Sequence, residues 1–153
     1  MEGDAALSPC GTYRYALWRK WASGPQVLFV MLNPSTANAT QDDPTIRRCI
    51  GFARSWGFGS LAVGNLFAFR CTDPSQLQTA RDPVGPENDR WLKRLRNEAS
   101  LCVAAWGNEG SRSGRSITAR ALIEPTHALG LTTFGAPRHP LYVRATTQAV
   151  KWL

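Results

Sequence analysis

Short apolar runs alternate with longer segments of helical spacing along the chain. The runs at 27–32 and 101–106 are continuously apolar, which predicts strands buried on both faces. Residues 61–66, Leu-Ala-Val-Gly-Asn-Leu, predict another strand. A shorter run at 128–131 predicts a last strand. Alternating aromatic residues at 13–18 predict a further strand, which can pair with 27–32 as a hairpin.

The segments between these runs have helix signals. Asp43 followed by Pro44 is typical of an N-cap and a first helical position, and Gly57 is well placed to end that helix. Apolar residues recur between them at helical spacing. The same reasoning predicts a short helix from Asp73-Pro74, and further helices over 86–97, 115–123 and 146–153.

Strands that alternate with helices indicate a mainly parallel sheet covered on both faces. We therefore expect residues 1–153 to form a single α/β domain. The expected architecture is a three-layer α/β/α sandwich around a mainly parallel four-stranded sheet, with an N-terminal antiparallel strand added. Ligands of such open sheets bind outside the carboxyl ends of the strands, so the residues that follow each strand are candidate site residues.

Composition excludes several classes of protein. The longest apolar run, 27–32, is far shorter than the roughly 18 residues of a membrane-spanning helix. The acidic N-terminus has no apolar segment behind it, so we expect a cytoplasmic protein without a secretory signal. None of the four cysteines forms a C-x-x-C pair, and only two histidines are present, so we expect no metal and no cofactor.

The charge balance favours an anionic partner. Lys and Arg number 18 against 11 Asp and Glu, which gives a net charge of +7. Nucleic acid or a nucleotide is the usual partner of so basic a chain, although solubility alone is another explanation. The Gly- and Arg-containing loop 107–116 lacks the Gly-Lys-Ser/Thr of a P-loop, which excludes that ATPase signature. This loop can cradle a phosphate at the following helix, or simply be solvated.

Polar residues stand where four of the predicted strands end or are followed by loops. These segments are Asn33-Pro34-Ser35-Thr36, Asn65 with the following 66–70, Trp106-Gly107-Asn108, and Arg138-His139-Pro140-Leu141-Tyr142. A proline directly after Asn33 or His139 fixes the backbone beside the polar side chain. Asn-Pro is also a common turn, and a His-Pro histidine can be a satisfied loop residue. Their joint position at strand ends favours a functional role.

Two resemblances follow from these motifs. Asn-Pro-Ser-Thr, Asp-Pro-Thr, Asn-Leu-Phe, Ala-Trp-Gly and His-Pro-Leu-Tyr together resemble a bacterial and phage family described as a domain of unknown function, over about residues 10–152. More distantly, the ordered strand-end motifs resemble the uracil-DNA glycosylase superfamily. That resemblance implies the glycosylase-like α/β fold. It implies that Asn33 orients the attacking water, Asn65 reads a flipped base, and His139 stabilises the departing base.

The resemblance also identifies supporting residues and departures. Trp106-Gly107 matches the third strand end, and Pro34 and Ser35 belong to the first motif. Ser35 stands where the superfamily has a stacking aromatic residue, which Phe67 or Phe69 can replace. An amide at Asn33 orients water but cannot take its proton, and Asp42 is a candidate for the missing acid. The candidate phosphate contacts are Arg70, Arg112, Arg115 and Arg138, and Leu141 or Tyr142 can wedge into a base stack.

We therefore expect a nucleobase- or nucleic-acid-binding protein. The most specific interpretation is a DNA glycosylase that hydrolyses the N-glycosidic bond of a modified or mismatched base, acting as a monomer on DNA rather than RNA. Three alternatives stay open: a non-catalytic nucleic-acid or nucleotide-binding module, a hydrolase or transferase of a free modified nucleotide, and an interaction protein without a ligand.

Overall fold

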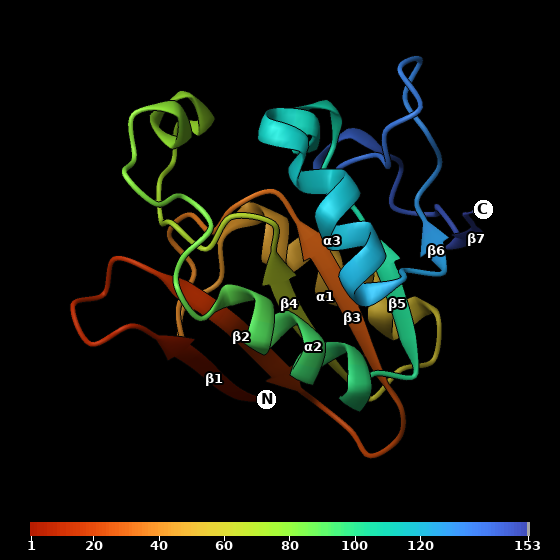
Figure 1. The fold of residues 1–153 in the computed structure, drawn as a ribbon. Coiled ribbons are helices and arrows are strands. Elements are labelled where there is room, and N and C mark those ends of the chain that lie inside the picture. The colour runs from red at the N-terminus through yellow and green to blue at the C-terminus, as the bar shows by residue number, and fades with distance from the viewer. Residues whose placement is uncertain (153) are drawn as a thin grey trace.

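A seven-stranded sheet lies at the centre of the molecule, with helices on both of its faces (Figure 1). The computed structural model describes residues 1–152. Along the sheet the strand order is β1–β2–β4–β3–β5–β6–β7. The strands are β1 (Glu2–Leu7), β2 (Arg14–Lys20), β3 (Gln26–Met31), β4 (Ser60–Asn65), β5 (Leu101–Ala104), β6 (His127–Ala128) and β7 (Val150–Lys151).

The sheet is mixed. The neighbours β4, β3, β5 and β6 are parallel to one another, whereas β1 and β2 on one side and β7 on the other are antiparallel. The α/β class is therefore confirmed, but the sheet is larger and more mixed than the predicted four-stranded, mainly parallel one. The two outermost strands lacked a sequence signal, because β1 reads Glu-Gly-Asp-Ala-Ala-Leu and β7 pairs through only two residues.

Two predictions about the edges of the sheet are wrong. The predicted hairpin between 13–18 and 27–32 does not form, because β2 pairs antiparallel with β4 and β3 lies beyond β4. The continuously apolar β3 is fully enclosed between two parallel neighbours, which is where such a strand is most stable. The closing helix predicted over 146–153 is also absent from its described part, 146–152; residue 153 lies outside the described residues. The Trp152 N–H donates instead to the Thr126 carbonyl at 2.9 Å, beside β7.

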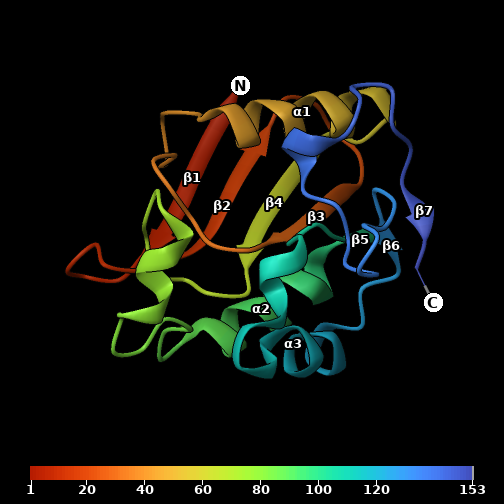
Figure 2. The ribbon, with the colours of Figure 1, turned by 90° about the horizontal axis from the view of Figure 1, so that it is seen from above.

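The helices form two layers, which Figure 2 shows on opposite sides of the sheet. Helix α1 (Pro44–Ser55) packs on one face, and α2 (Asn88–Glu98) and α3 (Arg115–Ile123) pack on the other. The predicted start of α1 is confirmed, since the Asp43 carboxylate accepts the Ile46 N–H at 2.9 Å. Short 3-10 helices η1 (Pro74–Gln78), η2 (Asn108–Gly114) and η3 (Pro140–Tyr142) lie in the loops.

Within residues 1–152, no helix combines the length and the apolar character needed to cross a bilayer.

Candidate functional site

A cavity of about 580 Å³ lies at the carboxyl ends of β3 and β5. Five chain segments enclose it: the loop that connects β3 to α1, the residues before η1, the residues that follow β5, the loop at Thr132 and the segment around η3. The principal lining residues are Asn33, Ser35, Asp43, Cys71, Thr72, Trp106, Gly107, Asn108, Thr132, Arg138, His139 and Tyr142. The predicted first, third and last strand-end motifs therefore meet at one cavity.

Asn33 is held by its amide nitrogen. Nδ2 donates to the Cys71 carbonyl at 2.8 Å and to the Pro34 carbonyl at 3.0 Å, which ties the loop after β3 to the segment before η1. The Cys71 N–H returns a hydrogen bond to the Pro34 carbonyl at 3.1 Å. The side-chain oxygen Oδ1 forms no hydrogen bond to any of residues 1–152. Asn33 therefore offers a fixed acceptor to a ligand or a water in the cavity.

His139 is a neutral donor facing the same cavity. Its Nδ1 accepts the N–H of Leu141 at 3.2 Å, which caps η3. Burial lowers the pKa of His139 below its ordinary value of 6.5, while the carboxylate of Asp43 opposes the shift. The imidazole is thus neutral at pH 7. Because Nδ1 is an acceptor, the ring proton resides on Nε2, where it can be donated to a ligand.

Two acidic residues line the cavity: Asp43, and Glu109, which is paired with Arg112. Asp42 does not line the cavity, and its carboxylate accepts from the Arg19 guanidinium at 2.8 Å. The hypothesis that Asp42 supplies the acid is wrong for this reason. Asp43 lines the cavity, caps α1 and acts electrostatically on both His139 and the buried Arg14. Burial lowers the pKa of Arg14 to about 10, and Asp43 opposes that shift.

Trp106 and Gly107 form the wall of the cavity at the end of β5. Trp106 is 3% exposed, and an added Cβ at Gly110 would lie 2.1 Å from the Trp106 indole, so only glycine allows η2 to pass so close. Gly107 has φ 73° and ψ −171°, a conformation that is essentially restricted to glycine. Its N–H donates to the Pro137 carbonyl at 2.7 Å, which brings the segment carrying His139 against β5.

A comparison with protein families shows to which family the chain belongs. The family described as "Protein of unknown function (DUF1643)" matches residues 14–141. The chain belongs to this family. The matched span runs from β2 into η3 and therefore includes almost the whole lining of the cavity. No curated protein and no solved structure matches the chain.

Two predicted base-contacting residues of this DUF1643 chain lie inside the fold. Asn65 is 2% exposed and does not line the cavity, and Phe67 is equally enclosed. The Asn65 Oδ1 accepts from Arg14 at 3.5 Å, and its backbone carbonyl accepts from Asn88 at 2.9 Å. Asn65 is thus enclosed by β2 and α2, and this placement corrects the predicted base-reading role. Phe69, the other candidate stacking residue, packs against Tyr13 away from the cavity.

Of the four candidate phosphate contacts, Arg138 alone lines the cavity, with an exposed side chain that donates to the Leu131 carbonyl at 3.0 Å. Arg115 is 6% exposed, because it donates to the Leu66 carbonyl at 2.8 Å and pairs with Asp89 at 2.7 Å. That structural role overturns its predicted phosphate contact. Arg112 pairs with Glu109 at 2.7 Å. Arg70 donates to the Gly11 carbonyl at 3.4 Å and lies outside the cavity lining.

Several cavity residues of the DUF1643 chain had no sequence signal of function. Cys71 and Thr72 line the cavity but precede the helix predicted from Asp73-Pro74 and belong to none of the strand-end motifs. Burial, with a smaller contribution from Asp73, raises the pKa of the Cys71 thiol, so it is protonated at neutral pH. Thr132 donates to Asn108 Oδ1 at 2.6 Å. Within residues 1–152, no three His, Cys, Asp or Glu side chains are grouped to hold a metal ion.

Proposed function

We propose that this protein binds a nucleobase of DNA in the 580 Å³ cavity and hydrolyses the N-glycosidic bond of a modified or mismatched base. The observation that carries the proposal is the pairing of two fixed polar groups across one cavity. Asn33 offers an acceptor, Oδ1, and His139 offers a donor, Nε2–H. A hydrolysis of this kind needs an acceptor for the attacking water and a donor for the leaving base.

The chemistry assigns each group a role. Cleavage develops positive charge on the sugar and negative charge on the base. Asn33 Oδ1 accepts a hydrogen bond from the attacking water, and the Asp43 carboxylate takes its proton as oxygen bonds to the anomeric carbon. The C–N bond breaks, and its electron pair goes to the base. His139 Nε2–H donates to the base oxygen as that charge develops, and one such donor is worth roughly 2.7–4 kcal/mol in other enzymes.

The position of the cavity supports this assignment. The strands β4, β3, β5 and β6 are parallel neighbours, and the first and third predicted motifs stand at the carboxyl ends of β3 and β5. This is the edge at which open α/β sheets bind ligands. The distant resemblance to uracil-DNA glycosylases assigns the same motifs to the same edge. The buried Asn65 departs from it, so the polar side chains that remain to read a base edge include Asn108 and Thr72.

One observation favours a second candidate, a non-catalytic nucleic-acid or nucleotide-binding module. The first motif carries an amide at Asn33, which cannot take a proton, and Asp43 is already engaged as the cap of α1. A binding module needs only the cavity and its hydrogen-bonding groups. In that case the ligand would bind without being cleaved.

A cleavage assay separates the two candidates. Labelled single- and double-stranded oligonucleotides would carry uracil, hypoxanthine, xanthine, a thymine mismatch or an alkylated base, and alkali would reveal abasic sites. The proposal predicts cleavage of at least one of them, lost in the Asn33→Ala, His139→Ala double variant. The variant His139→Asn is the matched control for folding, because an asparagine can still cap η3 but lacks the imidazole donor. Binding without cleavage by the wild type would establish the binding module instead.

A further inference from the structure

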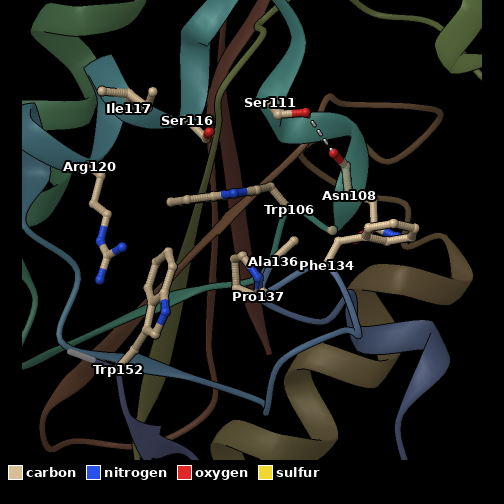
Figure 3. A pocket seen from close by; sticks show the side chains of 12 residues that line it. Trp106, Asn108, Ser111, Ser116, Ile117, Arg120, Phe134, Ala136, Pro137 and Trp152 are labelled. Atoms are coloured by element: carbon tan, nitrogen blue, oxygen red, sulfur yellow. Dashed lines mark hydrogen bonds between the residues drawn. The ribbon is translucent and has the colours of Figure 1, made fainter.

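A second, smaller cavity of about 240 Å³ lies beside Trp106 (Figure 3). It is enclosed by α3, the segment 134–137 and Trp152 near the C-terminus. Trp106, Gly107 and Asn108 line both cavities, so the end of β5 is a shared wall between them. An occupant of the second cavity would be the immediate neighbour of an occupant of the first.

The lining of the second cavity is aromatic and cationic. The Trp152 ring meets the Trp106 ring edge to face, with centroids 5.6 Å apart. The Arg120 guanidinium lies 3.7 Å from the centroid of the Trp152 ring, and Figure 3 shows both side chains at one end of the cavity. Arg120 is the only charged residue in this lining, and among residues 1–152 it forms no ion pair. An aromatic cavity with an uncompensated cation favours an aromatic ligand that carries negative charge.

The opposite end of the cavity is formed by a braced hairpin whose tip is Phe134. Leu131 and Pro137 form an antiparallel bridge, and the Thr132 N–H donates to the Ala136 carbonyl at 2.8 Å. Thr132 also donates to Asn108, which fixes the hairpin to the shared wall. Phe134 is 85% exposed at this fixed tip. Packing within the chain does not account for an aromatic ring in this position, whereas stacking on a base does.

We propose that the second cavity, with Phe134 at its rim, holds the base next to the one in the main cavity, so that the substrate is a nucleic-acid strand and not a free nucleotide. The proposal rests on nucleobase binding in the main cavity. A volume of 240 Å³ is below the roughly 300–1,000 Å³ of pockets for drug-sized ligands and suits one ring system. Gly107 and Asn108 line both cavities and therefore lie between the two base sites, and Arg120 gives the second cavity a positive charge.

Binding of two probes tests this proposal on the full chain. The probes are thymidine 5′-monophosphate and a single-stranded ten-residue thymidylate, chosen because stacking on aromatic residues tolerates any base. We expect Phe134→Ala to weaken binding of the oligonucleotide by about 5- to 150-fold, the equivalent of one stacked base, and to leave binding of the mononucleotide unchanged. Phe134→Tyr should retain the wild-type affinity. Leu7→Ala, which truncates a 41% exposed side chain on the distant strand β1, is the matched control.

The outcomes separate this inference from the proposed function. The second base site is overturned if Phe134→Ala leaves the affinity for the oligonucleotide unchanged, or if Leu7→Ala reduces that affinity as strongly. It is also overturned if the wild type does not bind the oligonucleotide. The main-cavity assignment is tested by Asn33→Ala, which should weaken both probes. If the wild type cleaves none of the oligonucleotides with modified or mismatched bases, the proposed hydrolysis fails, whatever the result at Phe134.

Discussion

Gly107 stands where β5 meets the segment that carries His139, and one added methyl group tests whether its backbone conformation supports the site. Its φ of 73° and ψ of −171° lie in a region that side chains other than glycine rarely enter, at a cost of about 1–3 kcal/mol. Space is not the obstacle, because an added Cβ would be 4.0 Å from the His139 Cβ, an ordinary contact. The Gly107→Ala variant should therefore lose about 1–3 kcal/mol of unfolding free energy, purely through backbone strain.

Gly51 provides the matched control. It lies exposed within α1, an added Cβ there would meet nothing within 4 Å, and its φ is not positive. Gly51→Ala should consequently stabilise the protein by about 0.5–1 kcal/mol, since alanine is the better helix former. The unfolding free energies of the two variants should then differ from each other by about 1.5–4 kcal/mol, with Gly107→Ala below the wild type and Gly51→Ala above it.

Urea unfolding followed by circular dichroism measures both variants. At this chain length, each kcal/mol corresponds to about 2–4 °C in the melting temperature, which a thermal scan resolves independently. If Gly107→Ala were as stable as the wild type, or as stable as Gly51→Ala, the reasoning from backbone strain at the end of β5 would be refuted.

Three further predictions concern other charged and titratable groups. Arg115→Ala should lower the unfolding free energy, measured by urea unfolding, by about 1–3 kcal/mol, because it removes a buried hydrogen-bond donor. Arg138→Ala, at the exposed cavity rim, is the control and should change that free energy by less than about 0.5 kcal/mol. Since burial lowers the pKa of His139 from 6.5, the unfolded chain takes up that proton more readily, so stability should fall between pH 7 and pH 5. His139→Asn should lose less stability over the same range, and an equal loss would contradict this assignment. Hydroxyl hydrogen bonds lower the pKa of the exposed Cys10 to about 7, so iodoacetamide at pH 7.5 should alkylate it before the three buried cysteines, as mass spectrometry of the digested protein would show.

Local signals in the sequence were sufficient for much of this architecture. The predicted strands at 27–32, 61–66 and 101–106 correspond to β3, β4 and β5. A strand buried on both faces is apolar in its own sequence, so it can be predicted without knowing which strands pair with it. Asp43 and Pro44 specified the start of α1 through hydrogen bonding and backbone geometry within one turn. Asn33 and Trp106 reached one cavity because parallel strands place their carboxyl ends at one edge of the sheet. His139 joins them through the hydrogen bond between Gly107 and Pro137.

The predictions that failed depended on contacts between distant segments. Asn65 stands at a strand end, as Asn33 and Trp106 do, but Arg14 from β2 and Asn88 from α2 enclose it. Arg115 stands at a predicted helix start, which suggested a phosphate contact, but in the structure it pairs with Asp89 of α2. The strands β1 and β7 exist through pairing with β2 and β6, and neither has an apolar pattern of its own.

The most direct test of the central claim compares two adjacent carboxylates. Asp43→Asn keeps a good N-cap for α1, and Asp42→Asn makes the same chemical change one residue away, outside the cavity. Single-turnover base release would be measured on the oligonucleotide that the wild type cleaves fastest, with both variants shown to be folded. The account predicts that Asp43→Asn slows release by about 100-fold or more, as expected for loss of a proton acceptor, and that Asp42→Asn stays within a few-fold of the wild type. Equal rates for the two variants, or no release from any oligonucleotide by the wild type, would contradict it.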